Sequence, residues 1–136
     1  MKKRGIFLLL ATVLVGCQSP DPVQKASPAL QLEYNAAFQK MLNDPGNLEM
    51  VMAYAQVATK TGDLEGAVGA YEGILLVDSN LPLVKLELGI LYYRLKSYDT
   101  SRMYLEGALA SPSLPAADRK PAERLLAKMP KQSKST

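Results

Sequence analysis

The sequence predicts an all-α fold, a short solenoid of about five or six helices arranged as antiparallel hairpins, and two observations lead to it. The first is the stretch 81–110, where apolar side chains recur at helical spacing on both sides of a very short turn. Two adjacent amphipathic helices with a short connection form an αα-hairpin. The second is an internal repeat, because at a shift of thirty-four residues Ala55 corresponds to Gly89 and Tyr71 to Leu105.

The period and several positions within it resemble the tetratricopeptide repeat. In the copy at about 82–115, Leu88-Gly89, Tyr92 and Ala108 resemble the signature positions of that family. The resemblance implies that this copy is the second full repeat and that the first lies at about 48–81. It also implies an incomplete leading repeat that contributes a helix at about 29–42. One departure is Lys96, which stands where the family usually has a turn glycine.

Local signals place the ends of the predicted helices. Asn47 and Asp63 are expected N-caps, since a short polar side chain can accept a hydrogen bond from an unpaired backbone N–H. Gly62 is expected in the left-handed conformation that closes a helix. The missing side chain of Gly89 is expected to let two helices approach closely, and the three glycines inside 64–77 are interpreted in the same way. Those glycines are Gly66, Gly69 and Gly73.

A last helix is predicted at 118–129, with an apolar stripe on one face and charged side chains on the other. Asp118 is the expected N-cap, which would place Pro121 in the first turn, where a missing N–H is tolerated. Because the last hairpin of a solenoid leaves an apolar side uncovered, this helix is interpreted as a cap.

The N-terminus predicts secretion and lipidation. Three basic residues at 2–4 precede an apolar run from Ile6 to Val15, and Leu14-Val15-Gly16 leads into Cys17, the one cysteine of the chain. This arrangement resembles a bacterial lipoprotein signal, which implies cleavage between Gly16 and Cys17, a diacylglycerol on the Cys17 sulfur and acylation, such as by palmitate, of its new amine. A transmembrane anchor is the alternative, but a helix of about ten residues rises only about 15 Å, half of a bilayer core.

Together these features divide the chain into four parts. The prediction is a signal peptide at 1–16, a lipidated cysteine and flexible tether at 17–29, a helical domain at 30–129 and a basic tail at 130–136. The tether is predicted because residues 18–29 are rich in Pro, Ser and Gln and have no periodic apolar face.

Charge argues against a nucleic-acid partner. The net charge of +3 includes three basic residues of the signal, so the remaining chain has 13 basic and 13 acidic side chains. The distribution is uneven, with seven Lys/Arg against twelve Asp/Glu at 21–118 and six against one at 119–136. No global basic field is therefore present, although a basic end follows an acidic body.

The residue types needed for catalysis are scarce. The chain has no histidine and one cysteine, which removes the usual general base and multi-thiolate metal sites. It has no phosphate-binding loop and no nucleophile-elbow serine. The carboxylates are interpreted as solvated helix faces, so the sequence predicts no enzyme, no cofactor and no metal.

The family resemblance also implies a partner groove, because the first helices of stacked repeats line a concave surface. Carried over to this chain, the predicted groove consists of Met52, Gln56, Thr59, Lys60, Leu86, Ile90, Tyr93 and Arg94. The alternative, which the sequence leaves open, is that Leu86 and Ile90 are packed under the leading helix or the cap.

The sequence thus favours a non-catalytic, membrane-tethered scaffold in the bacterial envelope, which docks a peptide or helix of another envelope protein. Gln18 is not the aspartate that typically retains lipoproteins in the inner membrane, which favours the outer membrane and a periplasmic orientation. One alternative is a regulator of cell-wall or secretion machinery that acts through its basic C-terminal end.

A weaker resemblance gives another alternative. The motifs Gly-Asp-Leu-x-x-Ala, Leu-Pro-x-Val-x-Leu-Glu-Leu-Gly-x-Leu-Tyr and Ala-Leu-Ala-Ser-Pro-x-Leu-Pro are similar to the periplasmic repeat domain of surface-lipoprotein assembly modifiers. That domain precedes a barrel, so the chain could be a truncated paralogue of such a protein. The sequence names neither the partner, the organism, the pathway nor the oligomeric state.

Overall fold

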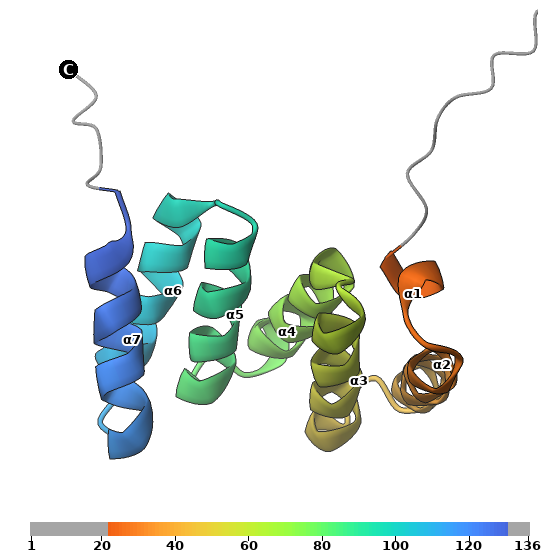
Figure 1. The fold of residues 1–136 in the computed structure, drawn as a ribbon. Coiled ribbons are helices and arrows are strands. Elements are labelled where there is room, and N and C mark those ends of the chain that lie inside the picture. The colour runs from red at the N-terminus through yellow and green to blue at the C-terminus, as the bar shows by residue number, and fades with distance from the viewer. Residues whose placement is uncertain (1–21, 131–136) are drawn as a thin grey trace, which may run out of the picture.

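The structure, a computed structural model, describes residues 22–130, and this part of the chain is helical with no strand (Figure 1). The helices are α1 (Pro22–Lys25), α2 (Pro28–Asn43), α3 (Leu48–Thr61), α4 (Leu64–Val77), α5 (Pro82–Arg94), α6 (Tyr98–Leu109) and α7 (Ala116–Lys128). The predicted all-α class is confirmed. Helices that follow one another in sequence pack on one another, most extensively α5 on α6, then α3 on α4 and α2 on α3.

Two of the expected caps are confirmed. The Asn47 side chain accepts a hydrogen bond from the Met50 amide at 3.3 Å, and Asp63 accepts one from the Gly66 amide at 3.0 Å. Each satisfies a backbone donor at the start of a helix that would otherwise lack a partner. Gly62 has a φ of +91°, the left-handed conformation expected of it.

The expected tether is helical in its second half. Pro22–Lys25 forms α1, and the Gln31 side chain fixes the turn after it by donating to the Ala26 carbonyl at 2.7 Å. α2 begins at Pro28, directly after its N-cap Ser27. Proline is tolerated in the first turn of a helix, because its missing N–H would have no helical partner there. Within the predicted tether, Pro22–Lys25 and the residues from Pro28 are therefore helical, and residues 17–21 lie outside the described part.

The last helix begins earlier than expected. α7 starts at Ala116 with Pro115 in the N-cap position, so Asp118 is not the cap. Pro121 consequently lies inside the helix, where its ring removes one helical hydrogen bond. The early start has a local cause, because the Asp118 amide already donates to the Pro115 carbonyl at 3.0 Å.

Two apolar clusters share the core. The N-terminal cluster joins α3, α4 and α5 through buried residues that include Tyr54, Tyr71 and Leu88, with part of α2 packed against it. The C-terminal cluster joins α5, α6 and α7. Because α5 contributes to both, it connects the two halves of the described chain.

The predicted close approach at Gly89 is confirmed. A Cβ built on Gly89 would lie 2.5 Å from the Leu105 Cγ, and the Ser101 hydroxyl donates to the Gly89 carbonyl at 2.6 Å. A side chain at Gly89 would push α5 away from α6. The small residues at 89 and 101 therefore set the spacing of this hairpin.

The same interpretation is wrong for two glycines of α4. Gly66 is tightly surrounded, since its Cβ would collide with the Asp63 carboxylate and the Tyr54 hydroxyl. Gly69 and Gly73 differ, because a Cβ on either would meet nothing within 4 Å. No helix of the described chain uses the space that these two glycines leave.

Two carboxylates, Asp63 at the start of α4 and Glu72 within it, connect this helix to tyrosines of the helices that precede and follow it. The Tyr34 hydroxyl of α2 donates to Asp63 at 2.7 Å, and the Tyr54 hydroxyl lies 3.4 Å from the same oxygen. Further along α4, Glu72 accepts hydrogen bonds from Tyr92 at 2.7 Å and Tyr104 at 3.2 Å. The Glu72 hydrogen bond, together with burial, raises the pKa of Tyr92 to about 12, so its hydroxyl stays a donor.

The glycine positions give a matched pair of variants. Gly89→Ala places a methyl group against Leu105 and is expected to lower the free energy of unfolding by about 2 kcal/mol. Gly107→Ala meets only an ordinary contact, 3.6 Å from the Lys85 side chain, and is expected to raise it by about 1 kcal/mol, since alanine favours helix over glycine. Chemical denaturation of the two purified variants measures both effects. Equal effects of the two substitutions would contradict the packing described at Gly89.

Lys96 adopts a conformation that usually belongs to glycine. Its φ is +62°, and the Ser97 amide donates to the Tyr92 carbonyl at 2.9 Å, the bond that ends a helix in a Schellman motif. A side chain in the left-handed region costs about 1 kcal/mol or more. Lys96→Gly is therefore expected to raise the free energy of unfolding by about 0.5–1 kcal/mol in the same denaturation assay. An unchanged or lower value would show that lysine is not strained at this turn.

Candidate functional site

The predicted groove is divided by burial. Gln56, Lys60 and Arg94 are exposed, and Met52, Thr59, Ile90 and Tyr93 are half-buried. Leu86 is only 6% exposed and belongs to the C-terminal cluster with Leu105, Ala122 and Met129. Of the two alternatives left open for Leu86, the packed one is the observed one, because residues of α7 cover it.

The α3 part of the predicted groove makes contacts within the chain. The Thr59 hydroxyl donates to the Ala55 carbonyl at 2.8 Å, one turn earlier in the helix. The Lys60 ammonium lies 3.7 Å from the Glu33 carboxylate of α2, and Met52 packs against the N-terminal cluster. This part therefore faces the leading helix at Lys60 and has few free polar groups.

The α5 part of the predicted groove opens toward α7. A hollow of about 580 Å³, here called the C-terminal hollow, lies between these two helices. It is lined by Leu86, Glu87, Ile90, Asp118, Pro121, Ala122, Arg124, Leu125 and Lys128. The hollow combines an apolar surface with two acids and two cations. It contains two predicted groove residues, whereas sequence reasoning missed the contribution of α7.

The two acids of the C-terminal hollow lack cationic partners. Burial raises the pKa of Glu87, and the nearby negative charge of Asp118 raises it further. The ion pair formed among residues 22–130 is that of Lys60 with Glu33, so neither acid is neutralised within the described chain. The hollow therefore places two carboxylates without ion-pair partners beside apolar side chains, and Arg124 and Lys128 also line it, so it offers groups of both charges to an occupant.

Arg119 connects α7, which forms one side of this hollow, to the end of α6 and the segment after it. Its guanidinium donates to the Leu109 carbonyl at 3.0 Å and to the Ser111 carbonyl at 2.5 Å, at the end of α6. The Leu109 carbonyl belongs to the last turn of α6, where a cation also suits the negative end of the helix dipole, and the Ser111 carbonyl additionally accepts from the Leu114 amide at 3.3 Å. Arg119 belongs to the helix predicted at 118–129, whose charged side chains are expected to face outward. Nothing local in the sequence indicates a contact across ten residues.

The interpretation of the carboxylates as solvated helix faces is wrong at two positions. Glu72 accepts hydrogen bonds from the Tyr92 and Tyr104 hydroxyls, and Glu87 is half-buried in the C-terminal hollow. The tyrosines were visible in the sequence, but their pairing with Glu72 spans up to 32 residues.

Other expectations receive no structural information. Cys17, the proposed lipid attachment point, and the tail beyond Pro130 lie outside the described residues. Among residues 22–130, no helix combines the length and apolarity that a membrane crossing needs. The same residues contain no cluster of three metal-ligating side chains.

No protein-family model matches this chain, and a search of curated proteins finds no match either.

The unusual environment of Glu87 leads to a pH-dependent prediction. Since its pKa is raised from 4.5 in the folded protein, the folded state binds this proton more tightly than the unfolded chain does. The resulting stabilisation is complete below the unfolded pKa and is lost as pH rises through the folded pKa. Glu87→Gln, which stays neutral, is therefore expected to have a higher Tm than the unsubstituted protein at neutral pH.

Thermal unfolding of both proteins from neutral pH down to about pH 4 measures this effect, because the two Tm values should converge as Glu87 becomes protonated. Glu106→Gln is the matched control, since Glu106 is exposed on α6. A difference in Tm that stays constant with pH, or equal behaviour of the two variants, would contradict the assignment.

Proposed function

We propose that this protein is a non-catalytic scaffold of the bacterial envelope, built as a short tetratricopeptide-like solenoid and tethered to a membrane through Cys17. Three observations support this architecture: the thirty-four-residue repeat, the packing of consecutive helices, and the close α5–α6 contact at Gly89. The lipoprotein-like signal at 1–17 supports the tether, and Gln18 favours the outer membrane facing the periplasm.

The observation that carries the docking role is the C-terminal hollow between α5 and α7. It offers apolar contacts from Leu86, Ile90 and Leu125 next to the unpaired acids Glu87 and Asp118. Binding sites commonly combine such an apolar surface with a few polar groups that fix orientation. The occupant that fits best is a peptide or helix segment with an apolar side chain followed by Lys or Arg.

Crosslinking in native envelopes tests this docking role. A photoreactive amino acid replacing Lys128, which lines the hollow, is expected to give a specific band that mass spectrometry identifies. The matched control replaces Lys120, which is exposed on the same helix but lies outside the hollow. Adding Glu87→Gln to the variant with the probe at position 128 should reduce the yield of the band, because one acid that would attract the occupant's cation is removed. Equal bands from both probe positions would argue against docking in the hollow.

A second candidate function places the interaction at the basic C-terminal end, where it would contact anionic wall polymer or lipid headgroups. Its support is the row of cations Lys120, Arg124 and Lys128 on α7, followed in sequence by Lys131 and Lys134. Binding to anionic vesicles that disappears on neutralising Lys128, Lys131 and Lys134 but survives Tyr93→Ala would favour this candidate. Loss with Tyr93→Ala alone would favour docking near α5.

A further inference from the structure

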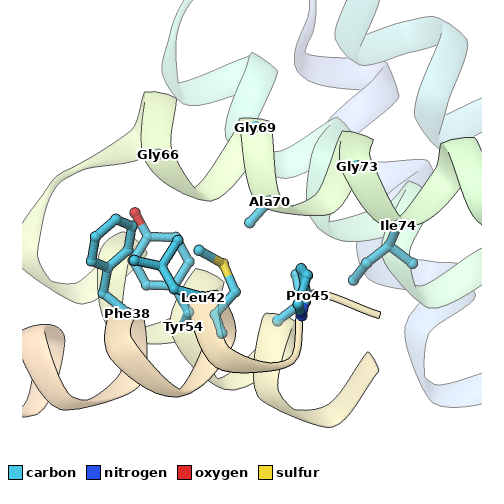
Figure 2. Close-up of a pocket in the computed structure, with 11 residues that line it drawn as sticks. Phe38, Leu42, Pro45, Tyr54, Gly66, Gly69, Ala70, Gly73 and Ile74 are labelled. Atoms are coloured by element: carbon cyan, nitrogen blue, oxygen red, sulfur yellow. The ribbon is translucent and has the colours of Figure 1, made fainter. Parts of the chain in front are cut away.

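A second hollow lies in the other half of the chain and leaves one face of α4 uncovered (Figure 2). This N-terminal hollow has a volume of about 480 Å³ and is formed by α2, the loop after it, α3 and α4. Phe38, Leu42 and Pro45 line one side, and Gly66, Gly69 and Gly73 of α4 line the other. Its lining contains no charged side chain, unlike that of the C-terminal hollow.

On the α4 side of the N-terminal hollow, the backbone at Gly69 and Gly73 is not covered by other described residues. A Cβ on Gly69 or Gly73 would meet no atom within 4 Å, so these glycines make room that no described helix fills. Each glycine inside a helix costs about 1 kcal/mol relative to alanine. Among residues 22–130, no internal contact offsets this cost at either position.

Two side chains protrude just beyond the hollow on the same helix. Leu76 is 90% exposed and Val77 is 87% exposed. Val77 follows Gly73 by four residues and Gly69 by eight, so all three lie on one stripe of α4. Single exposed leucines are common, whereas adjacent protruding side chains that continue an apolar hollow indicate an interaction surface.

The stripe carries no free charge. Between Gly66 and Val77 the one charged residue is Glu72, and its carboxylate accepts hydrogen bonds from Tyr92 of α5 and Tyr104 of α6. A partner that covers the stripe would therefore bury no unpaired charge, which would otherwise be a large penalty.

We propose that this face is the interface between two copies of the chain, which pack with their α4 helices antiparallel about a two-fold axis near Gly73. In that pairing Gly73 faces its own counterpart, and Gly69 faces Val77 of the second copy, because both positions are four residues from the axis. Leu76 and Val77 of each copy then enter the N-terminal hollow of the other.

The reason for choosing a second copy as the occupant is self-complementarity. A two-fold interface must present a patch and the complement of that patch on one surface. The α4 face does so, since it carries a hollow over its first half and a protrusion of matching apolar character at its end. The proposal does not depend on the docking role of the C-terminal hollow.

Disulfide trapping in cells tests the geometry. Two differently tagged full chains are produced together, both carrying Gly73→Cys, and mild oxidation is expected to give a dimer that contains both tags. A Gly69→Cys chain produced with a Val77→Cys chain should give the mixed dimer in higher yield than either chain alone. Two controls are the unsubstituted chain, whose one cysteine is Cys17, and Leu32→Cys, because Leu32 is 72% exposed on α2 outside the hollow.

Light scattering of the purified full chain in detergent tests the association without any cysteine. The unsubstituted protein and Leu32→Glu are expected to have twice the monomer mass, and Leu76→Glu the monomer mass with unchanged helical circular dichroism. A monomeric unsubstituted protein would overturn the proposal. The proposal would also be overturned if Gly73→Cys formed crosslinks only to another protein. It would be overturned as well if the protein were a monomer with an acyl chain bound at this face.

Discussion

The position of α4 depends on hydrogen bonds between its two carboxylates and the tyrosines of the neighbouring helices. Asp63 caps α4 and holds the α2 and α3 tyrosines, and Glu72 holds those of α5 and α6. These bonds orient one side of the helix toward the rest of the protein. Because that side is fixed, the glycines at 69 and 73 face outward, which is why the chain can have an open hollow there without losing its internal packing.

Residues with local effects could be predicted from the sequence, and residues with distant partners could not. The caps Asn47 and Asp63, the left-handed Gly62 and the spacing role of Gly89 all follow from chemistry within one turn or one hairpin. The pairing of Glu72 with Tyr104 and the contact of Arg119 with α6 depend on how helices meet after folding. Periodicity identifies an apolar face but does not say which neighbour covers it, as the open alternatives at Leu86 illustrate.

The C-terminal cap changes the character of the groove that the repeat resemblance implies. In α3 the predicted groove residue Lys60 contacts Glu33 of α2, whereas Leu86 of α5 is buried by residues of α7 and Ile90 lines the C-terminal hollow. Ala122 and Leu125 of α7 pack in the C-terminal cluster, and Arg124 and Lys128 of the same helix line the hollow. The helix that covers this part of the core therefore also brings charged side chains to the hollow.

The two hollows lie in opposite halves of the described chain, as Figure 1 shows for the helices that form them. One hollow is apolar and self-complementary, and the other is apolar with unpaired acids, so they suit different occupants. A dimer formed through α4 would leave both C-terminal hollows free. Two linked sites convert the second binding event into an intramolecular one, which raises avidity without any new contact.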